Sequence, residues 1–205
     1  NATVTVTGGV WTYTADISGL FDGNIDITAD VSDLAGNLAT QATKTLVKDT
    51  ALPTLEIDDP LMTDNKVNDE EQDSVVISGT SNAEDGQTVT LTITGSATII
   101  VTATVTGGVW SYTADISSLA DGSISIAADV SDLAGNPATQ ATKTLFKETV
   151  VPTLAIDNPL MTDNLVNEAE KTAVLISGTS NAEDGQTVTL WIIGSTTLNA
   201  TATVT

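Results

Sequence analysis

The stretch VWSYTADI (residues 109–116) carries the pattern that decides the fold. Its apolar side chains, beginning with Trp110 and Tyr112, alternate with polar ones. After a turn signal at Asp121-Gly122, the stretch ISIAADV (residues 124–130) repeats this alternation. Because successive side chains of a strand point to opposite faces, a period of two predicts two strands that each bury one face.

The same alternation extends outward on both sides, where short segments rich in Gly, Asn and Asp mark turns. Five further strands are expected at residues 55–57, 75–77, 89–93, 101–105 and 138–146. No segment has a helical period, so the pattern predicts an all-β fold, an immunoglobulin-like antiparallel β-sandwich of seven strands. The chain has no Cys, and Trp110 lies on the fifth strand instead of the third, so the topology differs in detail from that of antibody domains.

The pattern recurs every 99 residues, as the spacing of Trp11 and Trp110 indicates (110 − 11 = 99). Residues 77–91 reappear unchanged at 176–190. This period is longer than the roughly 20 to 50 residues of a solenoid repeat, and it is close to the size of a domain that folds alone. We therefore expect a tandem array of sandwiches.

The seams between repeats are predicted at two segments in which charged residues precede a proline, KDTALP (residues 48–53) and KETVVP (residues 147–152). On this division, residues 51–150 form one complete immunoglobulin-like repeat, residues 1–50 the C-terminal half of another, and residues 151–205 the N-terminal half of a third.

Charge restricts the possible partners. The chain has 27 Asp and Glu residues against 6 Lys and Arg, a formal net charge of −21. Nucleic acids and anionic membrane surfaces are repelled by such a chain, so we expect neither as a partner and expect a cation instead. The hydrophobic content of 40% is high enough to build a core, which argues against disorder.

Catalysis is disfavoured by composition. The chain has no His, Cys or Arg, and it has no nucleophile elbow, phosphate-binding loop or metal-hydrolase motif. The neighbouring carboxylates Asp58 and Asp59 lie in a predicted exposed loop without an evident cleft. We therefore expect no enzymatic activity.

The carboxylates are predicted to gather at the seams, because successive strands of a sandwich run in opposite directions and their loops alternate between two poles. Asp22, Asp49 and Asp132 would then meet at the first seam. Close carboxylates repel by about 1 to 4 kcal/mol per pair, so a counterion is needed. Ca²⁺ fits best, since it takes about 6 to 8 oxygen ligands, whereas zinc prefers Cys and His.

The same side chains have plainer interpretations, because an Asp before Gly or Asn is common in turns and acidic loops are often simply solvated. No EF-hand spacing is present, so any site must pool ligands from several segments. The candidate calcium ligands are Asp22, Asp33, Asp49, Asp58, Asp64, Glu71, Asp121, Asp132, Glu148, Asp157, Asp163 and Glu170.

Four segments in a fixed order resemble the bacterial immunoglobulin-like repeats of giant RTX and biofilm-associated adhesins. They are DLAGN (132–136), KETVVPT (147–153), DNLVNEAE (163–170) and ISGT (176–179). The resemblance implies extender domains, secreted by a type I system, that project a distal binding region from the surface of a Gram-negative cell. It also implies that calcium at the seams stiffens the array.

By this resemblance, the matching calcium positions are specific carboxylates at and beside the seams. They are Asp33, Asp49, Asp64, Asp132, Glu148 and Asp163. The two linkers differ, because Glu148 replaces Asp49, so their sites need not have equal geometry or calcium affinity.

An alternative function is adhesion by the repeat itself, to a glycan or to ice. Threonines form rows at residues 3–7 and at 102–106, and Trp191 takes an outward position where the other copy has Thr92. The plainer reading is that Thr favours strands and solubilises their exposed face. Trp11 and Trp110 are expected in the core, given their alternation with other apolar residues.

The two ends of the chain are similar in sequence, since residues 1–7 nearly match residues 199–205. Both half-repeats would leave strand edges and apolar side chains uncovered. We therefore expect that half-repeats of different molecules complement one another, in head-to-tail chains or in a closed swapped oligomer.

Overall fold

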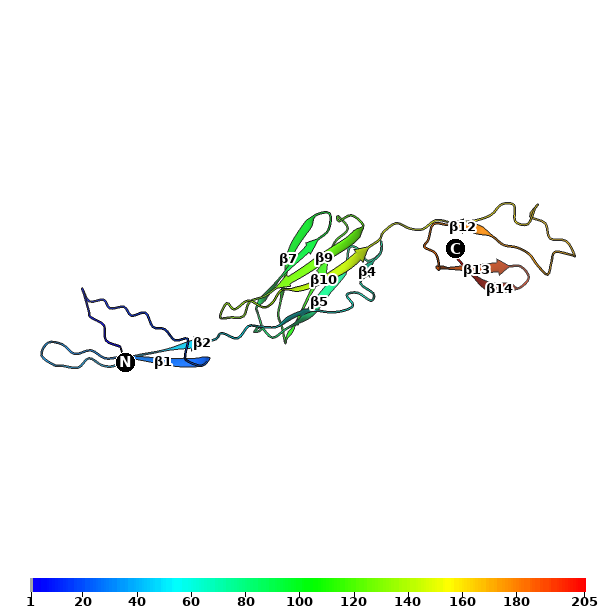
Figure 1. The fold of residues 1–205 in the computed structure, drawn as a ribbon. Helices are drawn as coiled ribbons and strands as arrows, with labels where there is room; N and C mark the ends of the chain where they lie inside the picture. The colour runs from blue at the N-terminus through cyan, green and yellow to red at the C-terminus, as the bar shows by residue number, and fades with distance from the viewer. Residues whose placement is uncertain (1) are drawn as a thin grey trace. The chain divides into compact units, whose positions relative to one another are not determined.

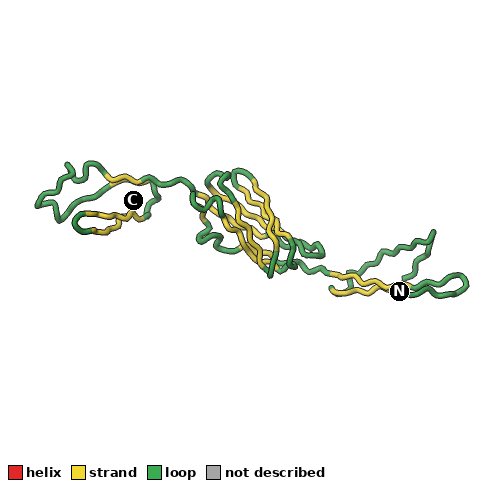
Figure 2. Tube along the Cα trace, turned by 180° about the vertical axis from the view of Figure 1, so that it is seen from behind, coloured by secondary structure: helices red, strands yellow, loops and turns green. Residues whose placement is uncertain are grey.

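The computed structural model describes residues 2–205, and these contain strands and loops but no helix (Figures 1 and 2). The all-β prediction is thereby confirmed. The contacts within the chain define two compact units, of which one ends at Lys147 and the other begins at Glu148. No helix among the described residues is long and apolar enough to cross a membrane.

The central part of the first unit contains every strand predicted there. Its strands are β3 (Leu55–Ile57), β4 (Lys66–Val67), β5 (Val75–Ser81), β6 (Thr88–Thr94), β7 (Thr98–Thr104), β8 (Val109–Ala114), β9 (Gly122–Asp129) and β10 (Ala141–Lys147). Strand β4 was not expected, because two residues are too few to show a period. It pairs in parallel with β10, so the prediction of a purely antiparallel sandwich is wrong at this edge.

Two sheets make up the sandwich (Figure 1). Strands β3, β5 and β8 form one sheet, and the other has the order β4-β10-β9-β6-β7. Strand β7, the fourth of the predicted strands, therefore pairs with β6 and not with the three-stranded sheet, unlike the fourth strand of a constant-type antibody domain. The wider sheet has β7 as a free edge.

The core lies between the two sheets and follows the alternation seen in the sequence. In β6, Val89, Leu91 and Ile93 are each 0% exposed, and Trp110 of β8 is 2% exposed. Trp110 packs against Gly79, where an added Cβ would lie 2.6 Å from the Trp110 ring and 2.0 Å from a backbone oxygen. Only glycine fits opposite Trp110 in the pairing of β5 with β8.

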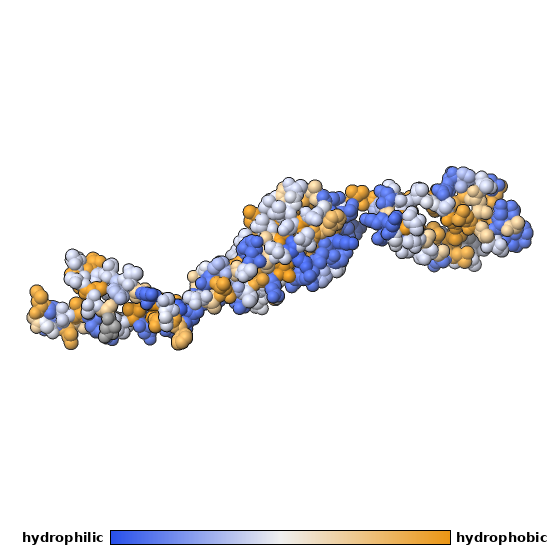
Figure 3. All heavy atoms as spheres, in the orientation of Figure 1, coloured by the Kyte–Doolittle hydropathy of each residue, from blue (hydrophilic) through white to orange (hydrophobic). Residues whose placement is uncertain are grey.

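Residues 2–50 repeat the last two strands of the sandwich. Strand β1 (Gly23–Ala29) pairs with β2 (Ala42–Lys48), and the pair Gly23 and Lys48 recurs 99 residues later as Gly122 and Lys147 (122 − 23 = 99). The segment contains no second sheet, and Trp11 is 51% exposed, so its predicted burial is wrong. Apolar side chains are visible on the surface of this segment in Figure 3.

The second unit repeats the first strands of the sandwich. Strands β11 (Leu154–Ile156) and β12 (Gly178–Ser180) pair with each other, as do β13 (Thr187–Ile193) and β14 (Thr197–Thr203). The spacing is again 99, for example from Thr88 to Thr187 (187 − 88 = 99). Division into one complete and two partial repeats, and complementation of partial repeats between molecules, both stay predictions.

Candidate functional site: the junction before the central repeat

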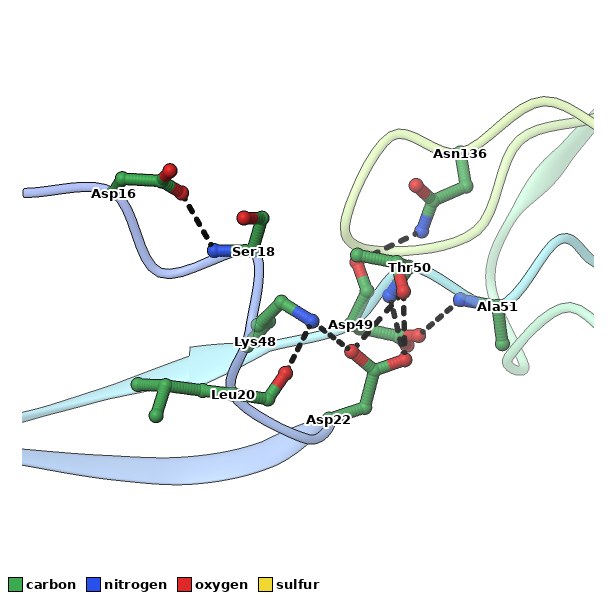
Figure 4. A network of polar contacts seen from close by, with 9 residues as sticks. All are labelled: Asp16, Ser18, Leu20, Asp22, Lys48, Asp49, Thr50, Ala51 and Asn136. Carbon is green, nitrogen blue, oxygen red and sulfur yellow. Dashed lines mark hydrogen bonds and ion pairs between the residues drawn. The ribbon is translucent and has the colours of Figure 1, made fainter.

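The junction between β2 and the central repeat is a short extended linker, residues 48–51, that is held by side chains from both sides (Figure 4). On the side of the central repeat, the amide nitrogen Nδ2 of Asn136 donates to the carbonyl oxygen of Asp49 at 3.2 Å. The same nitrogen donates to Oδ2 of Asp132 at 2.8 Å. One amide group thus bridges the linker and the loop between β9 and β10.

That loop, DLAGN at residues 132–136, is shaped by Asp132. Oδ1 of Asp132 accepts the backbone N–H of Asn136 at 2.8 Å, and its carbonyl accepts that of Gly135 at 3.1 Å. Gly135 has a φ of 93°, which favours glycine. The hydrogen bond from the Asn136 side chain, with those from backbone N–H groups, lowers the pKa of Asp132 below its ordinary value. The loop is therefore built around a charged aspartate.

On the other side of the linker, Lys48 and Asp22 hold its first residues. The ammonium of Lys48 donates to the carbonyl of Leu20 and to Oδ1 of Asp22, both at 2.9 Å. Oδ2 of Asp22 accepts the backbone N–H of Thr50 at 3.0 Å and its hydroxyl at 2.9 Å. These hydrogen bonds, that from Lys48 first, lower the pKa of Asp22. We call Asp22, Lys48 and Thr50 the linker clamp.

The contacts of Lys48 with a carbonyl and an aspartate recur in the central repeat 99 residues later. Lys147, the last residue of β10, is 3% exposed and donates to the carbonyl of Leu119 at 2.6 Å. Its ammonium lies 3.6 Å from Oδ1 of Asp121. The lysine takes a core-facing position in the alternation of β10, where a buried ammonium requires polar partners. Its burial beside a carbonyl and a carboxylate meets that requirement.

Most of the other predicted ligands accept hydrogen bonds elsewhere: Asp64, Glu71, Asp163 and Glu170 cap turns in their own segments, whereas Asp58 and Asp157 bind a serine 20 residues away. In the central repeat, Asp58 accepts from Ser78 at 2.6 Å, Asp64 from the N–H of Lys66 at 2.9 Å and Glu71 from the N–H of Asn68 at 3.1 Å. In the second unit, Asp157 accepts from Ser177 at 2.6 Å, Asp163 from the N–H of Leu165 at 3.0 Å and Glu170 from the N–H of Asn167 at 3.0 Å. Asp33 caps residues 35–37 as Asp132 caps its own loop.

The structure therefore brings together only part of the predicted set. Asp22, Asp49 and Asp132 lie around one linker, as expected for the first seam. Asp64 and Glu71 stay in separate turns of the loop region before β5, and Asp58 binds Ser78 of β5. Among residues 2–205, no group of three or more Asp or Glu side chains is placed to hold a metal by itself. Glu148 is exposed in the linker that begins the second unit.

Several side chains that organise this junction were not predicted from the sequence. The sequence predicted Asn136 only as part of a turn, and Lys48 and Lys147 only as parts of linkers, although the two lysines recur at the repeat spacing. Glu84 was also missed, and it accepts the backbone N–H of Leu133 at 2.9 Å, which ties the 132–136 loop to the loop before β6. Their recurrence beside the seam is the signal that could have found the lysines.

Comparison with known proteins places the fold in a family. A family model described as a bacterial Ig-like domain matches residues 61–147, and a second, described as a bacterial Ig-like domain of group 3, matches residues 108–201. The chain belongs to the bacterial Ig-like domain family. The two matches overlap and together span residues 61–201, which include most of the central repeat and most of the second unit.

Solved structures of this bacterial Ig-like chain's relatives include parts of large adhesins. One is a tetra-tandem repeat in the extending region of a large adhesion protein, with 29% identity over 98% of this chain and 51% of that chain and a TM-score of 0.41. Another belongs to a 1.5-MDa bacterial ice-binding adhesin, with 29% identity, coverage of 88% and 60%, and a TM-score of 0.44.

A third structure is a bacterial immunoglobulin-like domain from the M. primoryensis ice-binding adhesin. It has 30% identity over 46% of this chain and 96% of that chain, with a TM-score of 0.35. The chain thus spans about half to three fifths of the first two structures, 51% and 60%. No curated protein matches the chain.

Proposed function

We propose that the chain is a non-enzymatic spacer region of a large bacterial cell-surface adhesin. Its repeats hold a distal binding region away from the cell, their number sets the reach, and their junctions set the stiffness. The partners of each repeat are its neighbours in tandem. In this proposal the protein is extracellular, is exported by a type I system and belongs to a Gram-negative bacterium.

The observation that carries this proposal is that side chains on both sides of the linker at residues 48–51 form hydrogen bonds with its backbone. A free linker of a few residues would let neighbouring domains reorient, because domain interfaces of modest size permit motion. Here the linker carbonyl of Asp49 is bound by Asn136 at 3.2 Å, and the N–H of Thr50 is bound by Asp22 at 3.0 Å. Bonds to successive linker residues restrict the backbone rotations that would bend the array.

In our proposal, bound calcium restricts the linker further. The Asp49 carbonyl and the Asp132 carboxylate both point at a single donor, the Asn136 amide, at 3.2 Å and 2.8 Å. Two oxygens from different segments that converge on one small group suit a hard cation, which would take the place of the N–H group. In this proposal the Asn136 side-chain oxygen and the Asp49 carboxylate supply further oxygen ligands, and for this the Asp49 carboxylate gives up the Ala51 N–H that its Oδ1 accepts at 3.0 Å.

Asp22 fits calcium less well than the other seam carboxylates. Both of its oxygens already accept hydrogen bonds from Lys48 and Thr50, and Lys48 supplies the positive charge. An ammonium beside a carboxylate competes with a divalent ion. We therefore propose Asp49, Asp132 and Asn136 as the principal calcium ligands and Asp22 as part of the clamp.

A calcium titration of the full chain tests this proposal. We expect the melting temperature and the hydrodynamic length to rise between excess chelator and millimolar calcium, because an ion that binds only the ordered junction stabilises it. Asp132→Ala and Asp49→Ala should each abolish most of the rise. Asp115→Ala is the matched control, since Asp115 caps Ser117 in a turn away from the linker. Equal calcium responses in all four proteins, or none in any, would refute the calcium site.

A further inference from the structure

On the outer face of the second unit, Trp191 stands at a position where the central repeat has a threonine. In β6, Val89, Leu91 and Ile93 are 0% exposed and face the core, so Thr92 faces outward. The position of Thr92 is taken in β13 by Trp191 (191 − 92 = 99), which is 65% exposed. Strand alternation therefore puts this indole ring on the outside of the sheet.

The residue opposite Trp191 has changed together with it. Trp191 faces Asn199 across the β13–β14 ladder, whereas in the central repeat Thr92 faces Ile100 across β6–β7. The fifteen residues before this position, 176–190, are identical to residues 77–91 (91 − 77 + 1 = 15). The residues that follow, 92–106 and 191–205, differ at six positions, and two of these, occupied by Trp191 and Asn199 in the second unit, face each other.

The surroundings of this pair are uncharged, and they are polar except for Ile193, which is 77% exposed and faces Thr197 on the same side of the ladder. Thr189 faces Thr201 two residues along the ladder, on the same face as Trp191 and Asn199. Residues 185–205 contain no charged side chain, although the chain as a whole carries a formal charge of −21. Directly opposed side chains on one face lie about 4.5 to 5.5 Å apart at their Cβ atoms, so one ligand can reach both.

We propose that Trp191, Asn199, Thr189 and Thr201 form a binding platform for a neutral saccharide. The apolar face of a pyranose ring stacks on an indole, whose large flat surface loses little conformational entropy on binding. The amide of Asn199 and the threonine hydroxyls supply donors and acceptors for the sugar hydroxyls. Acidic sugars are repelled by the negative charge of the chain.

This platform goes beyond the spacer function, because it makes one repeat adhesive and leaves its neighbour inert. The central repeat carries Thr92 and Ile100 at the same two positions and so provides no aromatic surface there. Repeats with the same sandwich and the same junctions then differ in what their outer faces bind.

The test uses the full chain on an array of neutral oligosaccharides from the gluco, galacto, manno, fuco and N-acetylhexosamine series, with sialylated glycans beside them. We expect binding to at least one neutral series and none to the sialylated glycans. Trp191→Thr should raise the Kd of the best neutral glycan by about ten-fold or more, in line with an aromatic contact of about 1.4 kcal/mol. Asn199→Ile should raise it less.

The central repeat provides matched controls, since each of these substitutions places in the second unit the residue that the other copy carries. The double substitution Thr92→Trp and Ile100→Asn should create a second site for the same glycan. Absence of binding to every neutral series, or binding unchanged in Trp191→Thr, overturns the platform. Concentration-dependent self-association that Trp191→Thr removes, without glycan binding, would identify the face as a contact between copies and would also overturn it.

Discussion

The ammonium of Lys147 donates to the carbonyl oxygen of Leu119 at 2.6 Å, across 28 residues of sequence. This bond joins the last residue of β10 to the turn that precedes β9. Leu119 is 2% exposed, so its carbonyl has little access to water. Lys48 makes the equivalent bond to Leu20 at 2.9 Å. In both copies the chain leaves a repeat from a residue that is anchored to that repeat.

We predict that Lys147→Met destabilises the central repeat by about 1 to 3 kcal/mol, because the buried Leu119 carbonyl loses its donor while the side-chain volume is kept. Calorimetry of the full chain measures the loss. Lys171→Met is the control, since Lys171 forms only an exposed pair with Glu168. That change should alter stability by less than about 0.5 kcal/mol. Equal effects of the two substitutions would refute the anchoring role.

We predict that Gly79→Ala destabilises the central repeat by about 3 kcal/mol or more. An added Cβ would lie 2.0 Å from the Glu56 carbonyl oxygen and 2.6 Å from the Trp110 ring, and the backbone oxygen cannot move away without breaking the pairing of β3 with β5. Denaturant unfolding measures the change in the free energy of unfolding, and hydrogen exchange of the β5 amides locates it.

Gly95→Ala is the matched control for this steric argument. Its added Cβ would meet Ile124 at 3.4 Å and Leu119 at 3.5 Å, which is ordinary contact, and the backbone there needs no positive φ. The expected change is within about 1 kcal/mol, since the loss of chain entropy in the unfolded state favours Ala. A mild effect at Gly79 comparable with that at Gly95 would contradict the tight packing of Trp110.

Most of the fold could be predicted from the sequence, because alternation of apolar residues reports strands with one buried face. All seven strands expected in the central repeat are present. Strand β4 was missed because its two residues, Lys66 and Val67, are too few to show a period. The position of β7 beside β6 depends on sheet pairing, which a single sequence does not encode locally.

The candidate site was only partly predictable. Strand polarity placed Asp22, Asp49 and Asp132 correctly around one seam. Sequence could not show that Lys48 neutralises Asp22, because this depends on the turn before β1 lying beside the end of β2. Nor could it show that Asp64 and Glu71 are used separately as turn caps, since capping and ligation use the same oxygens.

The charge of Asp132 provides a pH-dependent prediction. The pKa of Asp132 is lowered in the folded state. At a pH above the unfolded pKa of about 3.9, ionised Asp132 therefore stabilises the folded state. This stabilisation is lost as the pH falls through the folded pKa. We expect Asp132→Asn to be less stable than the parent chain at pH 7 and the difference to vanish under acid. Melting temperatures of both proteins from pH 7 to about 2 measure this. A difference that persists at the lowest pH would contradict it.

Comparison of two asparagines isolates the contact between linker and loop. Asn136 and Asn37 make the same bonds to Asp132 and Asp33, both at 2.8 Å, but Asn136 also binds the carbonyl of Asp49. We predict that Asn136→Ala lowers the NMR order parameters of residues 49–51 from about 0.85 to below about 0.6, whereas Asn37→Ala leaves them unchanged. Both substitutions remove an aspartate cap, so only the linker contact distinguishes them. Equal order at residues 49–51 in both variants would mean that the clamp formed by Asp22, Lys48 and Thr50 holds the linker alone.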